Sequence, residues 1–294
     1  MERADKGKVE WLVVFGQPHG FRTLVDVVCN ILTRVKFELF WDVTKQMFFL
    51  GIDSIDPQHV CMIQSRLLCD DVHNLEAPTD FCVSTGILNT CLKSIPPHYS
   101  LDIIKYENSD DIFLRGYETA SNSHSLTFSI NTFCDEGGSI HLPDMEYDYI
   151  IEIDLGTLRH IVKTSISMQA DIISFQVDKG TSKNVTHTIF TVGYVGSASC
   201  KNEFKSSTIC ETPGSCCVIR AATDATDVIS MVTNMKKEYF DTFSAKYLQY
   251  FLKSMERSMI TMKLSPEKPL ILNYPLGIEE SYMLFVLAPK TEDA

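Results

Sequence analysis

The sequence predicts an α+β fold made of two similar halves. Amphipathic helical patterns are few, and short β-rich runs fill most of the chain between them. A strand followed by a helix, "EWLVVF" then "FRTLVDVV", returns in the second half as "YDYIIEI" then "LRHIVKTS". A tandem duplication, with two helices packed on antiparallel strands in each half, explains these observations.

Four stretches have the apolar spacing of helices that pack on one face. They cover about residues 19–33, 84–95, 155–167 and 244–255. Ser84 is a candidate N-cap for the second helix, and a pair of prolines follows that helix and ends it. The positions expected to be buried are Phe21, Leu24, Val25, Val28, Leu32, Ile87, Leu88, Cys91, Leu92, Ile95, Tyr247, Leu248, Phe251, Leu252 and Met255.

Strand-like runs connect these helices, and their order is also repeated. They include "QMFFLGI", "HVCMIQSRLL", "HSLTFSIN", "DIISFQV", "THTIFTVGYV" and "YMLFVLA". The helix end "CLKSI" and strand "SLDIIKY" recur as "FLKSM" and "MITMKL". Lys93 and Lys253 therefore occupy matching places in the two copies, as do Arg22 and Arg159.

A Gly- and acid-rich segment, "TFCDEGGSIHLPDME", separates the two halves. We expect an N-terminal domain at 1–133, a connector at 134–146 and a C-terminal domain at 147–294. The stretch 197–236 is expected to contain an insertion in the C-terminal domain.

Composition sets limits on function. The chain has 294 residues, 45% of them hydrophobic and 22% charged, with a net charge of −12. This acidity argues against nucleic-acid binding over the whole surface but permits a local basic patch. The apolar run in "MERADKGKVEWLVVF" is too short for a signal peptide or a membrane span, so we expect a soluble intracellular protein. Ten cysteines without a CxxC motif or zinc-ligand spacing indicate reduced, mostly buried thiols and no metal.

An enzyme needs a recognisable set of reactive groups, and the sequence offers none. GxSxG, HExxH, P-loop, GxGxxG and kinase patterns are all absent. The Asp pairs at 70–71 and 110–111 are interpreted as solvated turn acids. We therefore expect no catalytic residues, no cofactor and no enzymatic activity.

Basic residues gather on the outward faces of the predicted helices, although acids dominate the rest of the chain. Asp26 is the exception, and it can pair with Arg22 one turn away. A solvated lysine face is one interpretation. A shared cationic surface that holds a phosphate backbone is the other, and the scarcity of aromatic residues favours duplex over single strands. The residues concerned are Arg22, Lys93, Arg159, His160, Lys163, Lys246 and Lys253.

Several segments resemble the sliding clamp family, proliferating cell nuclear antigen (PCNA), in the family's order. They are "SIDPQHVCMIQ", "IHLPDMEYDYIIEI", "AKYLQYFLKS", "KPLILNYPL" and "FVLAPKTED". The resemblance runs from about residue 21 to residue 293 and is poor in 197–236, which is longer than the family pattern.

The resemblance implies three two-domain subunits closed into a ring, with helices around duplex DNA and sheets outside. It implies sequence-independent DNA contacts from Arg22, Lys93, Arg159, Lys163, Lys246 and Lys253. Thr23, Cys29 and Thr90 stand where the family has channel lysines, so the channel is expected to be less basic. Subunits are expected to pair the strand at about 124–131 with the strand at about 194–204 of the next copy.

A partner site follows from the same resemblance. It implies a hydrophobic pocket for a short peptide motif of polymerases, ligases and nucleases. The matching positions are Ile55, His59, Val60, Met62, Ile140, Leu142, Tyr147, Pro269, Val286, Ala288 and Pro289.

The implied function is that of a homotrimeric processivity factor for replication and repair, with DNA polymerase, a clamp loader and other clients as partners. Its expected location is the nucleus, or a viral replication compartment. Two alternatives stay open: a subunit of a heterotrimeric checkpoint clamp, and a viral processivity factor that works as a monomer or dimer.

Overall fold

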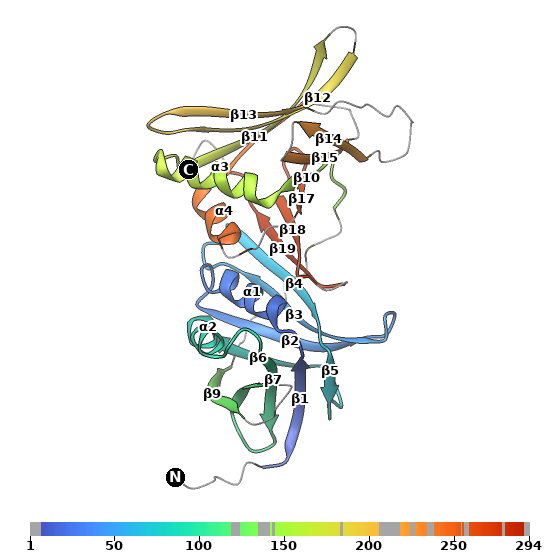
Figure 1. Ribbon diagram of the computed structural model, residues 1–294, viewed down its shortest axis with the longest axis vertical. Coiled ribbons are helices and arrows are strands. Elements are labelled where there is room, and N and C mark those ends of the chain that lie inside the picture. The colour runs from blue at the N-terminus through green and yellow to red at the C-terminus, as the bar shows by residue number, and fades with distance from the viewer. Residues whose placement is uncertain are drawn as a thin grey trace. The chain divides into compact units, whose positions relative to one another are not determined.

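The computed structural model describes residues 7–118, 124–134, 142, 145–182, 185–205, 218–223, 227–233, 238–253, 255, 259–277 and 280–290 (Figure 1). The chain forms two compact units. Unit 1 contains residues 1–57, 63–141 and 275–283, and unit 2 contains residues 58–62, 142–274 and 284–294. The main division, after residue 141, falls inside the segment expected to be the connector. Short segments on either side of it belong to the opposite unit.

Unit 1 has two helices and a run of antiparallel strands. Its sheet order is β4-β3-β2-β6, continued by β9-β8-β7-β1-β5. The bounds are β1 (Val9–Phe15), α1 (His19–Val28), β2 (Arg34–Asp42), β3 (Met47–Ile55), β4 (Cys61–Leu68), β5 (Asp71–His73), β6 (Thr79–Ser84), α2 (Thr85–Ser94), β7 (Ser100–Tyr106), β8 (Asp111–Tyr117) and β9 (Ser125–Phe133).

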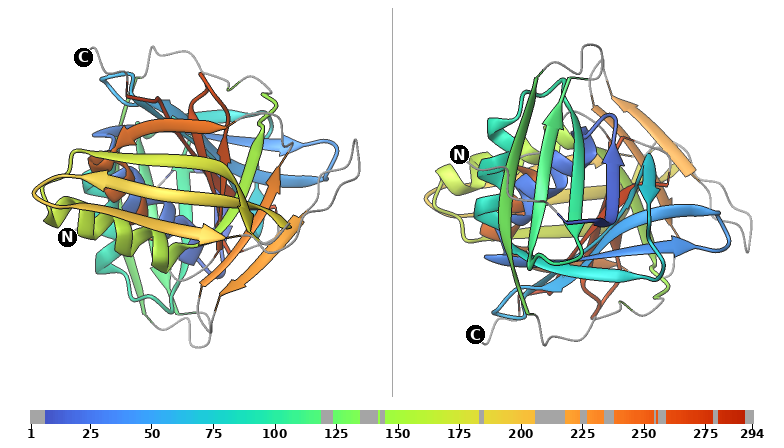
Figure 2. Two further views of the ribbon diagram at one scale, coloured as in Figure 1. Left: turned by 90° about the horizontal axis from the view of Figure 1, so that it is seen from above. Right: turned by 90° about the horizontal axis from the view of Figure 1, so that it is seen from below.

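Unit 2 repeats this architecture with two sheets, β13-β12-β11-β16 and β14-β15-β10-β17-β18-β19. Helix α3 packs against β12, as Figure 2 shows in its left view, and α4 follows β16. The bounds are β10 (Tyr149–Asp154), α3 (Leu155–Ser167), β11 (Ile172–Ser182), β12 (Val185–Val195), β13 (Ser199–Lys205), β14 (Val218–Thr223), β15 (Asp227–Thr233), β16 (Tyr239–Ser244), α4 (Ala245–Leu252), β17 (Met259–Leu264), β18 (Leu270–Pro275) and β19 (Tyr282–Leu287).

The duplication is visible in the strand orders. The row β4-β3-β2-β6 corresponds to β13-β12-β11-β16, and β5-β1-β7-β8-β9 corresponds to β15-β10-β17-β18-β19. Strand β14 is additional: it pairs with β15, which pairs in turn with the edge of β10. The stretch expected to hold an insertion therefore contains the repeat's own β13 and β15, together with one extra strand in the described part.

The predicted helices are confirmed, with changes at their ends. Helix α1 ends at Val28, five residues earlier than expected. There the Asn30 side chain donates to the Asp26 carbonyl at 2.5 Å, which competes with a further helical backbone bond. The expected Ser84 side-chain cap is wrong, because Ser84 occupies the N-cap position of α2 without a capping hydrogen bond. Asp154 does cap α3, by accepting from the Thr157 N–H at 2.7 Å.

The helical faces expected to be buried are buried, with few exceptions. Ile87 is wrong: 51% of it is exposed. The buried stripe of α2 consists of Thr85, Leu88, Asn89 and Leu92, and Ile87 lies outside that stripe on the helical wheel. Cys91 and Tyr247 are only half-buried.

Aromatic rings fill the two cores. In unit 1, the Phe37 ring packs on Phe81 at 5.2 Å between centroids and on Phe21 at 5.8 Å. In unit 2, Phe251 of α4 stacks on Phe285 of β19 at 4.5 Å. Each helix is therefore fixed to the strands through its apolar face, and its opposite face is left for polar side chains.

Two further searches were restricted to the described residues. No helix there is long and apolar enough to cross a membrane. In the same ranges, no three His, Cys, Asp or Glu side chains cluster in a way that could hold a metal ion.

Candidate nucleic-acid interface and docking region

The lysines predicted to contact DNA are all exposed. In unit 1, Lys93 forms an ion pair with Asp26 of the neighbouring helix α1 at 2.8 Å, and 67% of its side chain is exposed. The hydrogen bond with Asp26 raises the pKa of Lys93, so the lysine keeps its charge. The sequence had offered Asp26 to Arg22; the structure joins it to Lys93 across the two helices.

Arg22 has a different place in unit 1. Its guanidinium reaches the C-terminal end of α2 and donates to the carbonyls of Leu92, Ile95 and Pro96, the last two at 3.1 Å. Partial burial lowers the pKa of Arg22. Unpaired carbonyls at a helix C-terminus carry partial negative charge, and a cation that donates to them stabilises that end. Arg22 therefore joins α1 to the end of α2.

Arg159 does the same in unit 2. Its Nε donates to the Leu252 carbonyl at 2.9 Å, and its second guanidinium nitrogen donates to the Met255 carbonyl. Leu252 is the last residue of α4, as Leu92 lies near the end of α2. The duplicated arginines thus make duplicated helix caps. The carbonyl that each cap holds directly precedes Lys93 or Lys253 in the sequence.

Helices α3 and α4 expose three further lysines, Lys163, Lys246 and Lys253. Helix α4 contains no acidic residue. Lys246 Nζ lies 5.7 Å from the centroid of the Tyr250 ring, a cation–π distance that lets the lysine lie along its own helix. Unit 2 therefore presents cationic side chains on the helical faces opposite its core.

The residues predicted for peptide docking are distributed over both units. In unit 2, the Ala288 N–H donates to the Val60 carbonyl at 2.9 Å, which ties the C-terminal segment to the start of β4. The Tyr147 hydroxyl donates to the Pro269 carbonyl at 3.1 Å, and burial raises the pKa of Tyr147 to about 12. These contacts bring together two pairs of the predicted positions.

Other predicted positions differ in exposure. Met62 and Val286 are each only 6% exposed, so they support the region from beneath rather than forming an open wall. His59 is exposed and has a φ of 57°, the left-handed conformation of a turn residue. Leu142 and Pro289 are half-buried. Ile55 is half-buried at the end of β3 in unit 1, and Ile140 lies outside the described residues.

The sequence had not singled out Lys268 or Gln58. Lys268 Nζ donates to the Glu146 carbonyl and lies 5.6 Å from the centroid of the Tyr147 ring. Gln58 accepts from the Tyr247 hydroxyl of α4 at 2.9 Å. Lys268 directly precedes Pro269 in "EKPL", which is the one signal that could have identified it.

Two strands have edges available for pairing, as expected for subunit contacts. Strand β13 ends the order β13-β12-β11-β16. Strand β9 pairs with β8 along Ser125–Asn131, but in the described part it meets β6 only at Thr132 and Phe133. A free strand edge offers a row of backbone donors and acceptors to another chain.

Comparison with known proteins supports one fold. No family model matches the sequence, and no curated protein matches it. The crystal structure of the proliferating cellular nuclear antigen of Entamoeba histolytica matches with a TM-score of 0.74 and 18% identity, covering 97% of this chain and 100% of that one. The PCNA of Thermococcus kodakaraensis matches with a TM-score of 0.74 and 15% identity, covering 95% and 100%. The resemblance in the sequence is therefore confirmed at the level of architecture, and the chain has the PCNA fold.

Proposed function

We propose that the protein is a DNA sliding clamp, a ring of three copies that encloses duplex DNA and docks replication and repair proteins. The observation that carries the proposal is the match over the full length of two solved PCNA chains, which includes the duplicated pairs of helices and sheets. The protein then acts as a scaffold without catalysis, in the nucleus or in a viral replication compartment.

The free edges of β9 and β13 support the ring. Each is a seven-residue edge in the described part, over Ser125–Asn131 and Ser199–Lys205. Pairing β9 of one copy with β13 of the next would satisfy both edges and close three copies head to tail.

Exposed lysines on duplicated helices support the DNA contact. Lys93, Lys163, Lys246 and Lys253 are the contacts we propose, because their ammonium groups are exposed. Arg22 and Arg159 contribute by capping α2 and α4, in addition to any phosphate contact. Lysine contacts without base readout suit a protein that slides.

Peptide docking is proposed for the region around Val60, Tyr147, Pro269 and Ala288. Their backbone and hydroxyl contacts hold half-buried apolar side chains in fixed positions. Such a preformed apolar surface suits the aromatic anchors of a short peptide motif.

The mass in solution tests the proposal first. A homotrimer has three times the 33.2 kDa mass of the chain and should be present without other proteins. A polymerase-extension assay on primed circular DNA, with clamp loader, should then show longer products when the protein is added. A monomer that leaves product length unchanged would refute the ring.

The extra strand β14 and the missing channel lysines favour a second candidate. Thr23 is buried and Thr90 exposed at positions where the family has lysines. A subunit of a heterotrimeric checkpoint clamp, or a viral factor acting as a monomer or dimer, would tolerate both changes. A species that gains mass only with unlike partners would support the checkpoint role, and a stable dimer would support the viral one.

A further inference from the structure

The hairpin between β2 and β3 in unit 1 carries an unusual group of exposed apolar side chains. Among the described residues, seven large apolar side chains are exposed, and three of them lie between positions 41 and 47. They are Trp41 (43% exposed), Val43 (80%) and Met47 (41%). Side chains alternate along a strand, so Trp41 continues the face that buries Val35, Phe37 and Leu39. The core face of β2 therefore extends beyond the part of the sheet that is covered.

A cleft of about 300 Å³ lies under this extension. Trp41 and Phe48 form one wall, with their ring centroids 4.6 Å apart in an edge-on arrangement. Leu68 and Val72 line the opposite side, and the Cys69 N–H donates to the Phe48 carbonyl at 3.0 Å. Burial raises the pKa of the Cys69 thiol, so it stays neutral and contributes an apolar floor.

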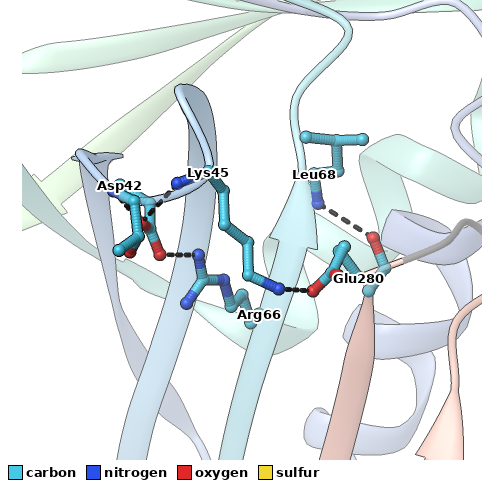
Figure 3. A network of polar contacts seen from close by, with 7 residues as sticks. Asp42, Lys45, Arg66, Leu68 and Glu280 are labelled. Atoms are coloured by element: carbon cyan, nitrogen blue, oxygen red, sulfur yellow. Dashed lines mark hydrogen bonds and ion pairs between the residues drawn. The ribbon is translucent and has the colours of Figure 1, made fainter.

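A network of polar contacts holds the hairpin in place (Figure 3). The Asp42 carboxylate accepts from the N–H groups of Thr44 at 2.9 Å and Lys45 at 3.0 Å, and it pairs with Arg66 of β4. Lys45 pairs with Glu280. The exposed apolar side chains are therefore presented by a fixed turn, which reduces the entropy lost when a partner binds.

The charge around the cleft has one sign. Asp70 and Asp71 line it, and among the described residues of the lining none is Lys or Arg. Asp71 is exposed, with His73 Nε2 at 3.1 Å, and Asp70 accepts from the Gly16 N–H at 2.5 Å. The nearby cations of Lys45 and Arg66 are already paired with carboxylates. An apolar cleft with an uncompensated acidic rim complements an apolar group next to positive charge.

We propose that this cleft docks a short segment of a partner protein in which an apolar anchor is followed by Lys or Arg. The anchor packs between the Trp41–Phe48 wall and Leu68, and the basic side chains lie against Asp70 and Asp71. The site is separate from the residues assigned above to peptide docking and does not require the ring. It gives unit 1 a contact surface of its own, with a different ligand preference.

Peptide binding to the whole protein tests this inference. The probes are acetylated nine-residue peptides containing Phe-Leu followed by Lys-Arg-Lys, the same peptide with three Glu in place of the basic residues, and one with Ala-Ala in place of Phe-Leu. The chain has two tryptophans, and Trp11 is only 3% exposed, so iodide quenching of fluorescence reports chiefly on Trp41. The first peptide should protect Trp41 from iodide, and the other two should bind about tenfold more weakly or worse.

Variants complete the test by isothermal titration calorimetry. Trp41→Ser should weaken binding of the first peptide at least about tenfold, and Asp71→Asn about threefold with a flatter salt dependence. Phe240→Ser removes an equally exposed aromatic residue from unit 2 and should leave binding unchanged. Equal binding of the acidic peptide, or full binding by Trp41→Ser, would overturn the proposal. So would self-association that Trp41→Ser abolishes while no peptide binds, because a second copy would then be the occupant.

Discussion

Replacing Arg159 by Leu separates a structural role from a DNA contact. The change removes the hydrogen bonds to the Leu252 and Met255 carbonyls while keeping an apolar stem on α3. A hydrogen bond to a charged group contributes about 1.5–3 kcal/mol, and a cation at a helix C-terminus about 0.3–1 kcal/mol. Arg159 is half-buried and its bonds share one guanidinium, so we expect the free energy of unfolding to fall by about 2–4 kcal/mol.

Urea denaturation measures this loss, and hydrogen exchange locates it. Protection should fall first over Ala245–Leu252, because the cap holds the end of that helix. Lys163→Leu on the same helix is the matched control: Lys163 is exposed, so stability should change by less than about 0.5 kcal/mol while DNA affinity falls. If Arg159→Leu weakens DNA binding but leaves urea stability and helix protection intact, the capping argument is wrong.

Three further predictions follow from the charges. The double change Lys246→Glu and Lys253→Glu should weaken DNA loading and lower the salt dependence of binding by about 0.9 per lost phosphate contact, whereas Ile140→Ala with Leu142→Ala should reduce peptide binding only; titrations of both ligands at several salt concentrations distinguish the two. The raised pKa of Tyr147, about 12 against 10 in the unfolded chain, predicts stability that is complete below pH 10 and declines as the pH rises towards 12. Tyr147→Phe should flatten that decline in urea melts, and an unchanged slope would contradict the assignment. Hydrogen bonds from Thr44 and Arg66 hold the pKa of Asp42 well below its ordinary value of 3.8, so its contribution is present above pH 3.8 and disappears as the pH falls. Asp42→Asn should make acid unfolding less steep, and an identical acid transition would show that the carboxylate does not stabilise the hairpin.

The sequence predicts best what depends on periodicity. Buried positions such as Phe21, Leu24 and Phe251 follow from helical spacing, because a side chain's direction on a regular element depends only on its position. Ile87 fails because it lies at the side of its helix, where burial depends on a neighbour that the pattern does not specify. The roles of the basic residues divide in the same way. Spacing places Arg22 on a polar face, but only the packing of α2 beside α1 shows which carbonyls the guanidinium can reach.

The docking residues show a second limit. Val60, Tyr147, Pro269 and Ala288 are far apart in the chain, and their contacts depend on how strands and connecting segments fold together. The resemblance to a known family supplied these positions, and spacing within the sequence could not have done so. It could not show that Val286 is buried, because a position matched by resemblance carries no information about the accessible area of its side chain.

The duplicated arginine caps connect stability with the proposed function. A clamp that slides needs weak phosphate contacts, and a weak contact is useful only if its position is fixed. Lys93 and Lys253 stand at helix ends, where the last turn has unpaired carbonyls and tends to fray. Arg22 and Arg159 occupy those carbonyls from the neighbouring helix, so each cap holds the helix end that carries a lysine. The same arrangement occurs in two halves whose sequences have otherwise diverged. We infer that the caps keep the lysines in register between the halves, and that losing either cap would disturb DNA contacts on its own half only.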